Sequence, residues 1–176
     1  VINDIFDKDL DKHVIRTSKR PLASGAISTI EAIIIFCLLC LVGLAILLSL
    51  NKTAIMFGFI SFFLFILYPL MKRITYWPQL FLGLTFNIGV IIGYVSINGN
   101  ISLSIFFLYL AGIFWTLGYD TIYAHQDRED DLRIGIKSTA ILFGDSSKLW
   151  VSAFYSLMII CLLIFGQLSD FEYLYY

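Results

Sequence analysis

The sequence predicts an all-α protein, built as a multi-pass transmembrane helical bundle, and three observations lead to this fold class. Of the 176 residues, 59% are hydrophobic and only 14% are charged, whereas soluble domains are about half apolar and a quarter charged. The mean hydropathy is +0.86. Five apolar runs approach the length of about 20 residues that an α-helix needs to cross a bilayer.

The five predicted spans follow one another with polar breaks between them. They cover residues 30–50, 54–71, 78–97, 101–123 and 149–168. Turn-forming residues mark the first three breaks, at Asn51-Lys52, at residues 75–77 and at residues 98–100. No repeat of solenoid length and no low-complexity stretch divides the chain. We therefore expect residues 1–176 to belong to a single transmembrane domain.

The basic residues are distributed unevenly between the two ends of the predicted spans. If the spans alternate in direction, eleven of the twelve lysines and arginines fall on one side, and only Lys52 falls on the other. The positive-inside rule makes the basic side cytoplasmic, so both large polar loops are expected there. The net charge of −1 gives no indication of a nucleic-acid partner.

The first polar segment carries carboxylates at helical spacing. Asn3, Asp7 and Asp11 are four residues apart, so in a helix they lie on one face. Like charges at this spacing repel each other, and the arrangement costs stability unless a cation lies between them. The alternative is an ordinary acidic helix end in contact with water.

A second acidic segment follows the fourth predicted span. Tyr123, Asp127 and Asp131 repeat the spacing of four, and Asp120 precedes them inside the apolar run. The two segments lie at membrane boundaries on the same side. Two ordinary solvated helix ends explain this poorly, because carboxylates near membrane depth are costly and usually functional. Paired oxygen ligands suit Mg²⁺, which takes one or two carboxylates together with substrate phosphates. The sequence therefore predicts a diphosphate held through Mg²⁺ by both segments.

Basic residues next to the two acidic segments support a diphosphate ligand, because arginine matches phosphate oxygens bidentately and lysine supplies a point charge. The candidates for diphosphate binding are Arg16, Arg20, Lys72, Arg73, Arg128 and Lys137. We attribute Lys8, Lys12 and Lys148 to the positive-inside bias alone, and we interpret His13 and His125 as surface residues. Some of the many aromatic side chains in the spans could line a groove for an isoprenoid tail or stabilise an allylic cation.

Three spaced motifs resemble those of the UbiA prenyltransferase family. The first is Asn3-Asp4-x-x-Asp7-x-x-x-Asp11 followed by Arg16-Thr17-x-x-Arg20-Pro21-Leu22-x-Ser24-Gly25. The second is Tyr68-Pro69-x-Met71-Lys72-Arg73 with Pro78-Gln79. The third is Tyr119-Asp120-Thr121-x-Tyr123-Ala124-x-x-Asp127-x-x-Asp130-Asp131 with Ile134-Gly135-Ile136-Lys137-Ser138-Thr139. Within the family, the third motif is most similar to the branch that prenylates 4-hydroxybenzoate in ubiquinone biosynthesis.

The resemblance implies a nine-helix fold whose active site opens on the cytoplasmic face, in a bacterial inner membrane or, in a eukaryote, the mitochondrial inner membrane. It also implies that the chain is incomplete at both ends, lacking the first helix, most of the second and the last two. The implied reaction is Mg²⁺-dependent transfer of a polyprenyl group from its diphosphate to the carbon ortho to the hydroxyl of 4-hydroxybenzoate. Its expected partners are these two substrates and the lipid bilayer.

The resemblance and the acidic segments together assign roles to individual residues. Asn3, Asp7, Asp11, Asp127 and Asp131 are expected to hold Mg²⁺. Asp7, Asp11, Asp127, Asp131 and Arg73 are the expected catalytic residues, because they would stabilise the departing diphosphate. Asp120 is a candidate for tuning the site.

Several alternatives stay open at this point. Another UbiA-type enzyme with a haem or naphthoate acceptor shares parts of the motifs, and the chain could be a truncated, inactive remnant. A soluble polyprenyl synthase also has paired aspartate motifs, but its helices would be amphipathic. A transporter would tend to carry carboxylates near mid-span.

Overall fold

The computed structural model describes residues 1–12, 17–172 and 175, and these residues form helices and turns without a strand. The described chain divides into two compact units, Val1–Ser49 and Leu50–Tyr176. Each unit is described by itself below. The single domain expected over residues 1–176 stays a prediction.

The first unit contains α1 (Ile2–Asp11) and α2 (Thr29–Leu48). Ser28 begins α2 with a capping box, in which its hydroxyl accepts from the Glu31 backbone N–H at 3.2 Å while its own N–H donates to the Glu31 carboxylate at 2.8 Å. Lys8 on α1 donates to the Thr29 hydroxyl at 3.0 Å. The start of α2 is therefore held against α1.

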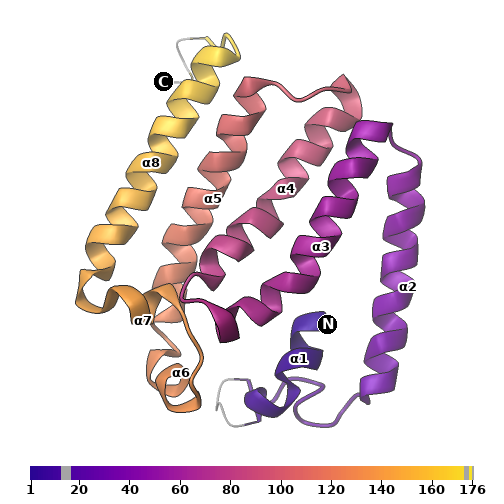
Figure 1. Ribbon diagram of the computed structural model, residues 1–176, viewed down its shortest axis with the longest axis vertical. Helices are drawn as coiled ribbons and strands as arrows, with labels where there is room; N and C mark the ends of the chain where they lie inside the picture. The colour runs from indigo at the N-terminus through magenta and orange to yellow at the C-terminus, as the bar shows by residue number, and fades with distance from the viewer. Residues whose placement is uncertain (13–16, 173–174, 176) are drawn as a thin grey trace. The chain divides into compact units, whose positions relative to one another are not determined.

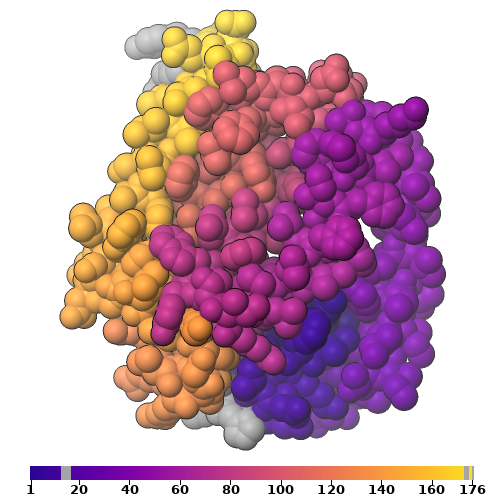
Figure 2. All heavy atoms as spheres, in the orientation of Figure 1, coloured from indigo at the N-terminus to yellow at the C-terminus, as the bar shows by residue number. Residues whose placement is uncertain are grey.

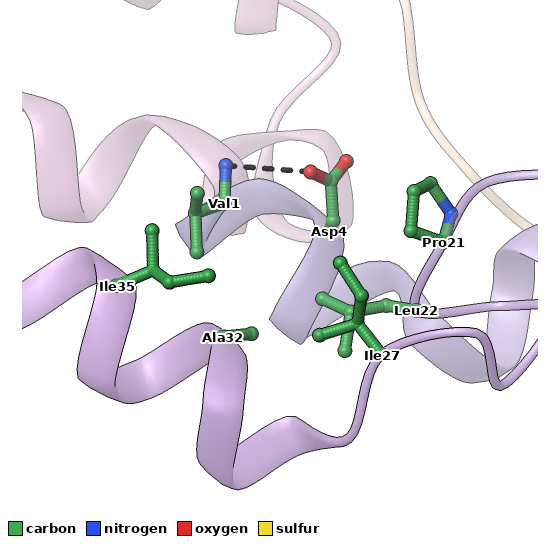
Figure 3. A pocket seen from close by; sticks show the side chains of 7 residues that line it. All are labelled: Val1, Asp4, Pro21, Leu22, Ile27, Ala32 and Ile35. Atoms are coloured by element: carbon green, nitrogen blue, oxygen red, sulfur yellow. Dashed lines mark ion pairs between the residues drawn. The ribbon is translucent and has the colours of Figure 1, made fainter.

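An apolar pocket of about 140 Å³ lies between α1, the turn after it and α2. Leu22, Ile27, Ala32 and Ile35 point toward one another in it, and the Asp4 carboxylate lies at its edge (Figure 3). This contact packs residues 21–27 against both helices of the unit. Arg20 directly precedes residues 21–27, so the packing of these residues also positions Arg20.

The second unit is a row of four long helices with two short helices at one end. The long ones are α3 (Lys52–Ile74), α4 (Pro78–Asn98), α5 (Leu103–Ala124) and α8 (Ser147–Leu168), and the short ones are α6 (Arg128–Ile134) and α7 (Thr139–Phe143), followed by the 3₁₀ turn η1 (Gly144–Ser146). Each long helix packs against the next one in this order (Figure 1). The loops joining α3 to α4 and α4 to α5 are short, so these neighbours are antiparallel.

α7 is anchored to the long helices by an aromatic core. Phe143 packs with Ile113, Leu117 and Phe154 and stacks on Trp150, with ring centroids 4.7 Å apart. The backbone N–H of Thr139 donates to the Gln79 side chain of α4 at 3.0 Å, and the Thr139 and Thr121 hydroxyls are 2.7 Å apart. These contacts fasten the segment of α6 and α7 to the end of α5 and α8, where it appears in orange in Figure 2.

Five helices are long and apolar enough to cross a membrane, namely α2, α3, α4, α5 and the stretch Thr139–Leu168 that includes α8. Each predicted span forms a helix whose bounds differ from the prediction by a few residues. α2 is apolar on every side, and among its residues only Ala32 is buried. Helices of this kind are typical of a bilayer and unlike the amphipathic helices of a soluble synthase. The prediction of an all-α, multi-pass membrane bundle is confirmed.

Small residues allow α4 and α5 to approach closely. Asn87 on α4 donates to the Gly83 carbonyl at 2.8 Å and to the Thr116 hydroxyl at 2.9 Å, while its side-chain oxygen faces Gly112. A Cβ on Gly112 would overlap the Asn87 amide. Close approach at glycine with a hydrogen bond between helices is a common way to pack membrane helices.

We expect Gly112→Ala to lower the free energy of unfolding by about 1–3 kcal/mol, the usual effect of overpacking. Gly89→Ala is the matched control, because a Cβ at Gly89 meets no atom within 4 Å. Thermal unfolding of both variants in detergent checks this. An unchanged unfolding temperature for Gly112→Ala would show that Asn87 moves aside without cost.

Candidate active site

The first acidic segment is the helix α1, as its spacing predicted. Asp7 is 1% exposed and Asp11 is 7% exposed, and Asn3 on the same helix is half-buried. Asp9 does not share this face. Its side chain is 87% exposed and pairs with Lys12 at 2.8 Å. α1 therefore presents a buried acidic face and a separate acidic residue in contact with solvent.

Arg20 lies against this acidic face. Its Nη1 donates to Asp11 Oδ2 at 3.0 Å and to Asp4 Oδ1 at 3.4 Å. The Thr17 hydroxyl donates to the Asp11 carbonyl at 3.1 Å, and the Arg20 backbone N–H donates to the Thr17 carbonyl at 2.9 Å. The turn at residues 17–20 thus brings a guanidinium to the end of α1. The other predicted cation of this segment, Arg16, lies outside the described residues.

The donors of α1 fit Mg²⁺ in their chemistry. Buried carboxylates are costly unless cations or hydrogen bonds compensate them. Among the described residues, no group of three or more His, Cys, Asp or Glu side chains could hold a metal ion by protein ligands alone. A pair of carboxylates with an amide oxygen leaves ligand positions for water and phosphate, and this is the usual composition of Mg²⁺ sites in proteins.

The second acidic segment is a helix break. α5 ends at Ala124, and Asp127 is the N-cap of the new helix α6. The backbone N–H of Asp131 donates to the Asp127 carbonyl at 2.8 Å. Asp favours N-cap positions, and the acidic residues in the first turn of α6 interact favourably with its dipole. Tyr123, Asp127 and Asp131 are therefore spread over α5, the junction and α6.

Lys137 connects the end of this segment to the end of α3. Its backbone N–H donates to the Lys72 carbonyl at 2.8 Å, its ammonium donates to the Ile74 carbonyl at 3.0 Å, and Nζ lies 5.5 Å from the centre of the Tyr76 ring. Lys72 and Arg73 form the last turn of α3, and Arg73 is exposed. The structure thus places the end of α3, which carries two predicted cations, beside Lys137. The contacts of Lys137 indicate that it also positions this segment.

We expect Lys137→Gln to loosen the segment, because it removes a hydrogen bond from a charged donor worth about 1 kcal/mol at this exposed position. Trypsin cleavage after Arg133, whose side chain is 75% exposed, should then be roughly fivefold faster, since cleavage follows local opening. Lys137→Arg should restore resistance, and Lys52→Gln serves as control. Unchanged cleavage in Lys137→Gln would contradict the positioning role.

Arg128 lies in a pocket of about 850 Å³ between the end of α5 and the start of α8. His125, Lys148, Ser147 and Asp145 line the same pocket. Among the described residues, Nε of Arg128 is buried without a hydrogen-bond partner. The pocket has an excess of positive charge and a guanidinium whose buried Nε–H makes no hydrogen bond among the described residues, and this chemistry suits an anion.

Two exposed residues of this pocket had no site role in the sequence interpretation. Lys148 was attributed to the positive-inside bias. His125 was interpreted as a surface residue and is exposed, and both residues line the pocket with Arg128. The signal in the sequence is weak, because Lys148 is separated from Arg128 by α6, α7 and η1. Asp120, the candidate for tuning the site, is half-buried on α5.

Comparison with known proteins places these residues in a family. The sequence model described as the UbiA prenyltransferase family matches residues 1–176. The chain belongs to the UbiA prenyltransferase family. The resemblance of its three motifs to that family is thereby confirmed.

Curated relatives in this family carry a common name. The chain is 49% identical to the mitochondrial 4-hydroxybenzoate polyprenyltransferase of Arabidopsis thaliana, over 99% of this chain and 43% of the relative. It is 48% identical to the human protein of the same name, over 99% of this chain and 47% of the relative. The chain thus spans less than half the length of these relatives.

A solved structure has the same fold. The apo structure of a UbiA homologue from Aeropyrum pernix K1 matches with a TM-score of 0.90 and 26% identity, covering 99% of this chain and 66% of that chain. The match supports the multi-pass helical bundle that the UbiA resemblance implied.

Proposed function

We propose that the protein containing this chain transfers a polyprenyl group from a polyprenyl diphosphate to 4-hydroxybenzoate, at the ring carbon ortho to the hydroxyl. The observation that carries the proposal is the identity of 48–49% over 99% of the chain to relatives named for this activity. The acidic face of α1 and the cations of α3 and α5–α8 add groups suited to Mg²⁺ and diphosphate. The reaction belongs to ubiquinone biosynthesis in this proposal.

The residues that would hold Mg²⁺ are Asn3, Asp7 and Asp11 on α1 and Asp127 and Asp131 at the second segment. When bound, Mg²⁺ neutralises charge on the diphosphate and so assists its departure. This assignment rests on the buried carboxylates of α1 and on the oxygen chemistry that Mg²⁺ prefers.

The chain's own cations bind and orient the diphosphate in this proposal. Arg20, Arg73 and Arg128 offer guanidinium donors and Lys72 an ammonium, while Lys137 holds the second segment on α3. The bond between the allylic carbon and the diphosphate oxygen breaks, and the electron pair leaves with the diphosphate. The ring carbon then forms the new carbon–carbon bond, and loss of the ring proton to a base restores aromaticity. Cations fixed around the leaving group favour the first of these steps.

We place the protein in an inner membrane, bacterial or, in a eukaryote, mitochondrial. The mitochondrial names of the relatives and the five apolar helices support this. The ends of α3, α5 and α6 that carry basic residues would face the cytoplasm or its mitochondrial equivalent, since Lys52 is at the opposite end of α3.

The test is an assay of membranes that contain the full-length protein. It supplies Mg²⁺, a polyprenyl diphosphate and 4-hydroxybenzoate, with a dihydroxynaphthoate acceptor in parallel and a chelator control. Prenylated 4-hydroxybenzoate that disappears with the chelator is the expected product. Prenylation of the naphthoate alone, or product formation that the chelator leaves intact, would refute the proposal.

A further inference from the structure

Three buried polar side chains meet where α4, α5 and α7 come together. Gln79 is at the start of α4, Thr121 is near the end of α5, and Thr139 begins α7. The side-chain oxygen of Gln79 accepts the backbone N–H of Thr139 at 3.0 Å, and the hydroxyls of Thr121 and Thr139 are 2.7 Å apart. We name these three residues the clasp. All three belong to the sequence motifs, yet none has a role in the site.

The clasp determines where α7 begins. The first backbone N–H groups of a helix have no partner inside that helix, and Gln79 supplies a partner for the N–H of Thr139. A helix of five residues is not stable alone, so its position depends on such contacts. The packing of Phe143 already gives this junction an apolar core. A hydrogen-bonded polar group beside that core fixes one arrangement of the elements more than it adds stability.

The clasp also closes the base of the segment that carries Asp127 and Asp131. Thr121 lies just before this segment and Thr139 just after it, so the contact between their hydroxyls joins its two ends. Within the segment, none of the residues that the structure describes in α6 is buried, and Figure 1 shows α6 beyond the ends of the long helices. The position of α6 is therefore set from the ends of the segment.

We propose that the clasp positions the second acidic segment for Mg²⁺, so that its three residues act on prenyl transfer through Asp127 and Asp131. The inference rests on the proposed function. Mg²⁺ demands nearly ideal octahedral geometry, so a segment with a loosened base binds it more weakly even where the helix bundle is intact. A contact that served stability alone would leave the Mg²⁺ requirement unchanged.

The first test is Thr121→Val in the full-length protein, because valine keeps the shape of threonine and removes its hydroxyl. The Mg²⁺ concentration for half-maximal prenyl transfer should rise roughly tenfold, the lower end of what loss of a contact that orients metal ligands costs. Thr121→Ser retains a hydroxyl and should restore the unaltered value.

Thr116→Val is the matched control. Thr116 is also a fully buried threonine of α5, but its hydroxyl accepts from Asn87 and donates to the Gly112 carbonyl within the bundle. This variant should unfold at a lower temperature in detergent, because it leaves the Asn87 amide without one of its partners. Its Mg²⁺ requirement should not change.

A second readout needs no turnover. Trypsin cleavage after Arg133, whose side chain is exposed, should be roughly fivefold faster in Thr121→Val without Mg²⁺ or substrates, since loss of a buried hydrogen bond eases local opening. The rate should be unchanged in Thr116→Val. Gln79→Met removes the acceptor for the Thr139 N–H at similar side-chain length. It should behave as Thr121→Val does, and it replaces that variant if Thr121→Val does not fold.

An unchanged Mg²⁺ requirement or an unchanged cleavage rate in the folded clasp variants would overturn the inference, and so would an equal change in Thr116→Val. If neither clasp variant folded, the clasp would stabilise the bundle itself, and this result would also overturn the inference. Failure of the proposed function is distinct, because the unaltered protein would then form no prenylated 4-hydroxybenzoate.

Discussion

Replacing Asp7 with asparagine in the full-length protein is expected to lower kcat/KM for prenyl transfer on the order of a thousandfold. Asp7 is 1% exposed on the acidic face of α1, and asparagine has nearly the same volume, so the change removes the charge and leaves the packing. An assay at saturating Mg²⁺ and 4-hydroxybenzoate measures the loss. The Mg²⁺ concentration needed for half-maximal rate should rise in any residual activity.

The matched control is Asp9→Asn on the same helix. Its side chain is 87% exposed and pairs with the neighbouring Lys12, and such surface pairs contribute little. We expect near-normal turnover in this variant. Both proteins should insert into the membrane in equal amounts. If Asp7→Asn also retained near-normal turnover, the assignment of α1 to the metal would be wrong.

Asp127→Asn should lower kcat/KM by a similar factor, on the order of a thousandfold. Asp127 is the N-cap of α6, and its side chain makes no capping hydrogen bond in this structure. Asparagine is as good an N-cap residue as aspartate, so the helix break is expected to persist while the charge is lost. The same assay measures the effect, with the trypsin cleavage rate after Arg133 as a readout of the segment's structure.

Glu129→Gln is the control for this position. Glu129 is exposed in the first turn of α6, and its neutralisation should change only a weak interaction with the helix dipole. If Glu129→Gln lost as much activity as Asp127→Asn, the second segment would contribute its overall charge and not a specific carboxylate.

The membrane helices could be predicted because their formation depends on local properties. An apolar run of sufficient length is stable as a helix in a bilayer whatever it packs against, since all its backbone hydrogen bonds are internal. The predicted run 78–97 and the helix Pro78–Asn98 agree closely for this reason. The short helices α6 and α7 were not predicted, because α7 depends on the contacts of Phe143 and Thr139 with distant helices.

The acidic face of α1 could also be predicted, because helical spacing alone brings Asp7 and Asp11 to one side. Tyr123, Asp127 and Asp131 have the same spacing but do not lie in one continuous helix. Acidic residues in sequence favour a new helix start as much as the continuation of an old one, and spacing cannot decide between the two.

Composition, apolar run length and motif spacing were thus sufficient for the membrane bundle, the family and the two acidic segments. Only the tertiary structure showed that Arg20 pairs with Asp11, that Lys137 is bound to the end of α3, and that Lys148 joins Arg128 in one pocket. The physical reason is the range of the interactions. Partition into a bilayer sums over neighbouring residues, whereas the meeting of charges from separate segments depends on how the helices and loops between them pack.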